Sequence, residues 1–178
     1  MLAGELTAPA VTLAEAQAYV RVETGEEEAI LAGLIRTASA MCEQFTGRVI
    51  LSREFTETLG ACSDWQRLAL TPVRSIDGVE AIGEDGNAVP LAAGDYAMDV
   101  DSSGDGWVRL AAASSGVRKL RVTGTAGMAA DSNEVPEPIR QGVVRLTAHL
   151  FNARDGGGGD PPAAVTALWR PFRRMRLS

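Results

Sequence analysis

Histidine is almost absent from this sequence, which has only His149 among its 178 residues. A histidine in an amphipathic helix can act as a general base, but no pattern in the sequence pairs His149 with a nucleophile. We therefore predict that the protein is not an enzyme, has no catalytic residue and binds no cofactor. His149 is expected to have a packing or interface role.

Cysteine is nearly as scarce, and this excludes further kinds of site. Cys42 and Cys62 are the two cysteines of the chain, and they fit no zinc-binding spacing. In a cytosolic chain such residues are expected to be free thiols rather than a disulfide. Nothing in their neighbourhood would activate a thiolate. We predict no metal site, and both cysteines are expected to be small buried side chains.

Long apolar runs and a secretory signal are also missing. No apolar stretch approaches the roughly 20 residues that cross a bilayer. The first ten residues, MLAGELTAPA, lack the basic and apolar regions of a signal peptide. Hydrophobic residues make up 46% of the chain, as in ordinary globular proteins. We expect a folded protein that is made in the cytoplasm and contacts no membrane.

Two glycine-containing segments have features of binding loops without their defining residues. Segment 99–106, DVDSSGDG, begins like a calcium loop, but Leu110 stands where such a loop needs a bidentate glutamate. Its residues also suit a tight bend, so we predict a β-turn there. Segment 124–127, GTAG, lacks the lysine of a phosphate-binding loop. The glycine run at 156–159 is expected to be a hinge.

Helical signals lie at both ends of the chain. Thr12 and Glu15 have capping-box spacing and predict a short helix, and Thr24 and Glu27 predict the start of a second one. The second helix, over 25–46, has an apolar stripe at helical spacing and a terminating glycine at position 47. A third helix is expected over 136–154. A last short one is expected to follow the prolines at 161–162.

Between residues 48 and 123 the pattern changes to short alternating segments separated by turn signals, which predicts antiparallel strands. The predicted fold is α+β: a helical bundle, made of a long N-terminal helix hairpin plus C-terminal helices, with a small inserted antiparallel β subdomain. The expected divisions are N-terminal helices over 1–47, the β insertion over 48–127, a core helix over 128–155, and a hinge, short helix and basic tail over 156–178.

Charge is distributed unevenly along the chain. The net charge is −6, yet the last ten residues contain four arginines and no acid. Arginine and aromatic side chains are concentrated in buried protein interfaces, so the tail is predicted to bind a partner. The predicted partner-binding residues are Trp169, Arg170, Phe172, Arg173, Arg174, Met175 and Arg176. Glu26, Glu27 and Glu28 stand at the start of the second predicted helix, where the helix dipole favours negative charge.

The order of these segments resembles a known family. The opening "VTLAEAQAYVRVE…EEEAILAGLIRTASAMCEQFTGRVIL", the middle "LALTPVRSIDGVEAI" and the later "GWVRL…LRVTGTAGMA…VPEPIRQGVVRLTAHLFNAR" are similar to phage head–tail connector (adaptor) proteins. The likeness spans roughly positions 11–155. It fits a tailed phage and a gene transfer agent-like particle equally well.

This resemblance implies a structural role in the neck of a virion or phage-like particle. It implies a ring, typically of twelve copies, that sits beneath the portal protein, extends the DNA channel and offers a platform to a stopper or tail-completion protein. DNA would pass through without sequence-specific binding. The tail at 169–178 would fold against the portal. Acidic residues lining the channel, with Glu26, Glu27 and Glu28 as candidates, would repel the DNA backbone.

Three other functions remain open at this stage. A neck stopper or tail terminator of the same particle would share the chemistry but is usually richer in strands, so a helix-dominated protein would favour the adaptor. A small enzyme would need an acidic residue beside His149 in a pocket. A DNA-binding module led by the arginine tail would show strong salt dependence.

Overall fold

The computed structural model describes residues 2–3, 9–22, 25, 27–111, 116–153 and 161–174. The chain divides into two compact units. The first, called the β unit, comprises residues 1–5 and 52–127, and the second, called the helical unit, comprises residues 6–51 and 128–178. Among the described helices, none is long and apolar enough to cross a membrane.

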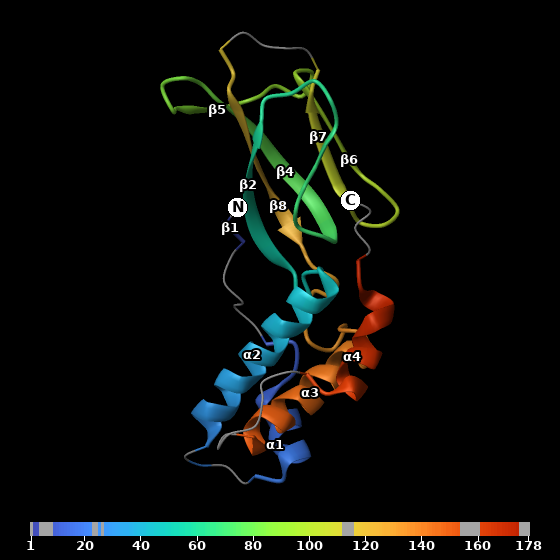
Figure 1. The fold of residues 1–178 in the computed structure, drawn as a ribbon. Helices are drawn as coiled ribbons and strands as arrows, with labels where there is room; N and C mark the ends of the chain where they lie inside the picture. The colour runs from blue at the N-terminus through green and yellow to red at the C-terminus, as the bar shows by residue number, and fades with distance from the viewer. Residues whose placement is uncertain are drawn as a thin grey trace. The chain divides into compact units, whose positions relative to one another are not determined.

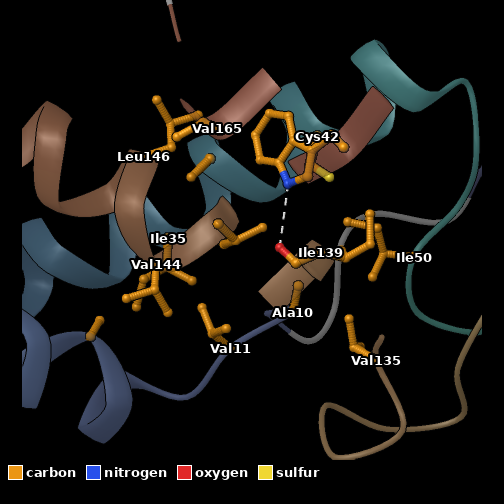
Figure 2. Close-up of a cluster of buried hydrophobic side chains, with 14 of the residues drawn as sticks. Ala10, Val11, Ile35, Cys42, Ile50, Val135, Ile139, Val144, Leu146 and Val165 are labelled. Atoms are coloured by element: carbon orange, nitrogen blue, oxygen red, sulfur yellow. Dashed lines mark hydrogen bonds between the residues drawn. The ribbon is translucent and has the colours of Figure 1, made fainter. Parts of the chain in front are cut away.

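The helical unit contains four α-helices and one short 3-10 helix within the described residues. They are α1 (Leu13–Val20), α2 (Glu28–Thr46), α3 (Glu137–Asn152), α4 (Ala163–Trp169) and η1 (Arg170–Phe172). The apolar stripe that the sequence indicated on α2 is largely buried: Leu31, Ile35, Ala38 and Cys42 face inward, although Ile30 remains exposed. Figure 2 shows Ile35 and Cys42 in one cluster with Ile139, Leu146 and Val165.

Caps at the helix ends explain where α1 and α2 begin and end. The predicted capping box of α1 is present, with the Thr12 hydroxyl accepting from the Glu15 amide and the Glu15 carboxylate accepting from the Thr12 amide. Helix α2 begins later than predicted, at Glu28 with Glu27 as its N-cap, and the second predicted capping box also involves Thr24. Thr24 lies outside the described residues. Gly47 ends α2 as predicted, with a left-handed φ of 67°.

An ion pair joins the first and third helices. The Arg140 guanidinium on α3 contacts the Glu15 carboxylate at the start of α1. Burial alone would raise the pKa of Glu15, but hydrogen bonds from Thr12 and Arg140 outweigh it and hold that pKa below its ordinary value. The short helix α1 is therefore held in place by charge as well as by the buried Ala16.

In its described residues, the β unit contains two antiparallel sheets (Figure 1). The five-stranded sheet has the order β1-β2-β8-β4-β5 and the three-stranded sheet the order β3-β7-β6. The strands are β1 (Leu2–Ala3), β2 (Arg53–Gly60), β3 (Gln66–Arg67), β4 (Val73–Ile82), β5 (Ala88–Pro90), β6 (Tyr96–Val100), β7 (Gly106–Leu110) and β8 (Lys119–Ala126). In β8, Leu120, Val122, Gly124 and Ala126 are buried and alternate with more exposed residues.

The predicted architecture of a helical bundle with a long N-terminal helix hairpin is wrong. Helix α1 has only eight residues, so it cannot form a long hairpin with α2. The β part is not a small insertion, since its two sheets draw on most of 53–126 and on Leu2–Ala3. The prediction failed because β8 pairs with β2 and β4, which lie far from it in the sequence. Local periodicity does not indicate pairing between such distant segments.

Candidate partner-binding site

Four arginines lie in two segments that are hydrogen-bonded to each other near the C-terminal end of α2. Arg48 follows this helix, and Arg170, Arg173 and Arg174 follow α4. The Arg48 Nε donates to the Phe172 carbonyl oxygen at 3.0 Å, and the Arg174 amide donates to the Thr46 carbonyl oxygen at 2.8 Å. The Arg173 guanidinium lies over the Phe45 ring, 5.7 Å from its centroid. We call this set of four arginines the basic tip.

The end of α2 suits a group of cations. The last carbonyl groups of a helix have no partner within it and carry the negative end of the helix dipole. Here the Arg174 amide donates to the Thr46 carbonyl oxygen, and the Gly47 amide donates to the Glu43 carbonyl oxygen. The Thr46 hydroxyl donates to the Cys42 carbonyl oxygen. The segment after α4 is thus fixed by backbone hydrogen bonds, which leaves the side chains of Arg170 and Arg173 exposed.

Trp169 is the anchor of this segment. It is fully buried, and its indole NH donates to the Ile139 carbonyl oxygen at 3.4 Å, the dashed line in Figure 2. Its ring packs against Phe45 with 6.0 Å between centroids. On α3, Gly142 makes room for it, since a Cβ there would lie 2.0 Å from the indole nitrogen. The helical unit itself therefore uses Trp169 in its core.

The predicted partner-binding residues differ in how far their side chains are exposed. Arg170 and Arg173 are exposed, Phe172 and Arg174 are half-buried, and Trp169 belongs to the core. Met175 and Arg176 lie outside the described residues. Binding of a partner by this segment stays a prediction, carried by the exposed arginines.

The three glutamates considered for a channel lie near the start of α2. Glu28 is in the first helical turn and accepts a hydrogen bond from Gln17 at 3.2 Å, and Glu27 is the capping residue. Glu26 lies outside the described residues. Both described carboxylates are half-buried, which fits a role at the helix start. Their position in a channel stays a prediction.

The residues considered for chemistry lie in different elements, with His149 on α3 and segment 99–106 connecting β6 and β7. His149 is half-buried on α3. In the part of the chain that the structure describes, no group of three or more histidine, cysteine, aspartate or glutamate side chains could hold a metal ion. The predicted turn at 99–106 is present, because the Gly104 amide donates to the Asp101 carbonyl oxygen and the Asp101 carboxylate accepts from the amides of Ser103 and Asp105.

The two cysteines should differ sharply in reactivity. Cys42 is fully buried, and burial together with the neighbouring Glu43 raises the pKa of its thiol well above the ordinary value. Cys62 is half-buried and accepts from the Asp64 amide at 3.3 Å. We expect Cys62 to react with a thiol reagent in the folded protein and Cys42 to react more than about a thousandfold slower, through unfolding. A colorimetric thiol assay with Cys62→Ser as control tests this, and equal rates would contradict it.

The three-stranded sheet has a distinctive face whose residues were not predicted to be functional. The tripeptides Trp65-Gln-Arg67 and Trp107-Val-Arg109 repeat one W-x-R pattern, and the register sets Arg67 opposite Trp107. The Arg67 guanidinium lies 5.9 Å from the centroid of Trp107, and that of Arg109 lies 4.8 Å from the centroid of Trp65. The repeated spacing was visible in the sequence, but that the two segments are neighbours was not.

Comparison with known proteins gives structural relatives alone. No protein-family model and no curated protein matches the sequence. A chain in the neck of an empty gene transfer agent (GTA) particle computed with C6 symmetry is 28% identical, with a TM-score of 0.79. A chain in the virion of a native GTA particle is 27% identical with a TM-score of 0.80, and one in the neck of a native GTA particle computed with C12 symmetry is 25% identical with a TM-score of 0.77. Each match covers 100% of this chain and 98% of the other.

Proposed function

We propose that this chain is a structural subunit of the neck of a gene transfer agent or phage-like particle and not an enzyme. The observation that carries the proposal is the likeness to neck chains over the full length of this chain, at 25–28% identity. Fold alone would allow many functions. A shared role is supported because the similarity includes both units, nearly the whole of the other chain, and the sequence as well as the fold.

Within the neck, we propose the role of an adaptor that forms a ring beneath the portal. The cyclic symmetry of the two neck structures supports a ring, in which each subunit presents different surfaces to its two neighbours. The exposed Arg170 and Arg173 of the basic tip would contact the portal. A net charge of −6 for the chain suits a channel that repels DNA, with Glu26, Glu27 and Glu28 as candidate lining residues.

A charge-reversal experiment tests the contact with the portal. The double variant Arg170→Glu/Arg173→Glu should bind the portal at least about tenfold more weakly, because reversing charge at an interface costs more than 1.4 kcal/mol. Charge reversal is a more specific test than deletion of 170–178, because the deletion also removes the hydrogen bond from the Arg174 amide to the Thr46 carbonyl oxygen. Sedimentation with portal rings, followed by electron microscopy, gives the measurement.

The matched control is Arg36→Glu/Arg145→Glu. These two arginines are also exposed and lie on α2 and α3 of the same helical unit, so the change in net charge is identical. The control should bind the portal as the native protein does. Equal binding by both double variants would refute the role of the basic tip, and no binding by the native protein would refute the adaptor role.

The second candidate is a neck stopper or tail terminator of the same particle. Its support is the pair of antiparallel sheets, because those proteins were expected to be richer in strands than an adaptor. This candidate expects the native protein to sediment with tail tubes and to ignore isolated portal rings. The adaptor role expects the reverse, so the same assay with both components separates the two candidates.

A further inference from the structure

Two indoles and one carboxylate surround a hollow on the three-stranded sheet. In β7, Gly106 and Val108 are buried, so Trp107, which lies between them in the sequence, is on the opposite face. Asp99 of β6 is directly opposite Trp107 in the register and therefore shares this face. Trp65, the residue before β3, keeps 42% of its surface exposed, a high fraction for so large an apolar side chain. Trp65, Asp99 and Trp107 line a hollow of about 270 Å³, which we call the indole hollow.

The lining of the indole hollow is aromatic and anionic. Among the described residues, no lysine or arginine lines it. Asp99 is exposed, and within the described ranges its carboxylate has no ion pair and no side-chain hydrogen bond. The neighbouring carboxylates are engaged, since Asp101 accepts from the Trp107 indole at 3.0 Å and Asp105 pairs with Arg67 at 3.3 Å. Asp99 is therefore the carboxylate of this face that remains available to a ligand.

The same two indoles already hold cations in this structure. The Arg67 guanidinium lies 5.9 Å from the centroid of Trp107, and the Arg109 guanidinium lies 4.8 Å from the centroid of Trp65. A positive group over an aromatic ring is attracted by the negative face of the ring, and tryptophan gives the strongest attraction. Because neither arginine lines the hollow, the indole surface inside it is left for another cation.

Charge excludes the other kinds of ligand. Three carboxylates, those of Asp99, Asp101 and Asp105, stand against the two guanidinium groups of Arg67 and Arg109 on or beside this face. An anion in the hollow would meet Asp99 and be repelled. An apolar ligand would cover the Asp99 carboxylate without giving it a partner, and burying an unpaired charge costs free energy. A cation with an apolar body satisfies both the carboxylate and the rings.

The volume of the indole hollow limits the size of that cation. Sites for small molecules usually measure roughly 300–1,000 Å³ and enclose most of their ligand. The indole hollow is smaller, at about 270 Å³, and open on one side. It therefore suits one charged group together with a short aliphatic stem.

We propose that the indole hollow binds one organic cation, an ammonium or guanidinium group on an aliphatic stem. Trp65 and Trp107 would contact the stem and the charged group, and the Asp99 carboxylate would pair with the charge. Such a cation belongs either to a lysine or arginine side chain of another protein or to a free amine, and the recognition chemistry is the same. The proposal goes beyond the proposed neck function and does not depend on it.

Titration of the full chain with n-butylammonium, which is the lysine side chain without its backbone, tests the proposal. The indole N–H signals of the three tryptophans are followed by NMR. The signals of Trp65 and Trp107 should shift and saturate, whereas that of the buried Trp169 should not move. The matched ligand control is n-butanol, which has the same stem without the charge and should bind at least about fivefold more weakly. Sodium chloride at equal ionic strength is the control for screening.

Two variants separate the contributions of the carboxylate and the rings. Asp99→Asn keeps the size of the side chain but removes its charge, and it should weaken n-butylammonium binding about three- to fivefold. Trp65→Leu keeps an apolar side chain but removes the ring, and it should weaken binding to a similar extent, about three- to fivefold. Asp95→Asn is the matched control, because Asp95 is also exposed, directly precedes β6 and does not line the hollow. It should bind as the native chain does, and thermal melting checks that all variants are folded.

The proposal would be overturned by n-butanol binding as tightly as n-butylammonium, by sodium chloride producing the same shifts, or by native affinity in either Asp99→Asn or Trp65→Leu. The source of the cation is then assigned with two further probes, putrescine and a lysine blocked at both backbone ends. Binding of the blocked lysine that is no weaker than that of putrescine assigns the hollow to a protein side chain. Tighter binding of putrescine assigns it to a free amine. Because no portal or particle takes part, failure here leaves the proposed neck function untouched.

Discussion

Trp169→Ala should lower the free energy of unfolding of the helical unit by about 3–5 kcal/mol, the usual cost of removing a large buried aromatic side chain. The residue is fully buried between α3 and the end of α2, so the cavity left behind would be large. The same change removes the anchor of the basic tip. We therefore expect weaker portal binding as a second consequence.

Gly142 allows the same contact to be probed from the other side. Adding a methyl group at Gly142 would drive it into the Trp169 indole, so Gly142→Ala should destabilise the native protein. In the Trp169→Ala background the clash is absent, and the same change should stabilise by up to about 1 kcal/mol through helix propensity. Denaturant unfolding followed by circular dichroism gives all four free energies.

The matched control for this cycle is Gly33→Ala on α2. A Cβ there would meet only the tip of Arg36, at 3.9 Å, so the change should be neutral or stabilising in both backgrounds. A loss of stability at Gly33 similar to that at Gly142 would contradict the explanation by steric contact. An unchanged effect of Gly142→Ala after removal of Trp169 would contradict it as well.

Gly124→Ala should destabilise the β unit by about 3 kcal/mol or more, at the upper end of the cost of overpacking. Gly124 lies in β8, between β2 and β4, at the sheet centre. A Cβ there would lie 2.2 Å from the Ser75 carbonyl oxygen and 3.0 Å from the Phe55 ring. Because the first of these atoms belongs to the backbone, only a shift of β4 away from β8 could relieve the clash.

Fluorescence of Trp65 and Trp107, recorded during urea unfolding, measures this effect, because both tryptophans lie in the β unit. A Trp169→Phe background removes the signal of the helical unit. Gly94→Ala is the control in the same unit, since a Cβ at Gly94 meets nothing within 4 Å. A midpoint for Gly124→Ala equal to that of the control would disprove the close approach of β4 and β8.

Features that depend on neighbours within a few residues could be predicted correctly. The α1 capping box, the stripe of α2, the termination at Gly47 and the turn at 99–106 all follow from contacts three or four residues apart. The start of α2 was predicted at residue 25, three residues before its observed start at Glu28, because the spacing of Thr24 and Glu27 is typical of a capping box. Short-range patterns indicate that a helix exists more reliably than where it begins.

The sequence alone determined the mixed α and β composition, the helical segments at the two ends and the arginine-rich tail, because periodicity and charge are local properties. The tertiary structure alone decided the size of the sheets, the burial of Trp169 against Gly142, and the meeting of two W-x-R segments about forty residues apart. The reason is that strand pairing and side-chain packing join residues whose separation along the chain has no fixed period. Which of the tail's aromatic and cationic side chains face outward was therefore settled by packing, with Trp169 inward and Arg170 and Arg173 exposed.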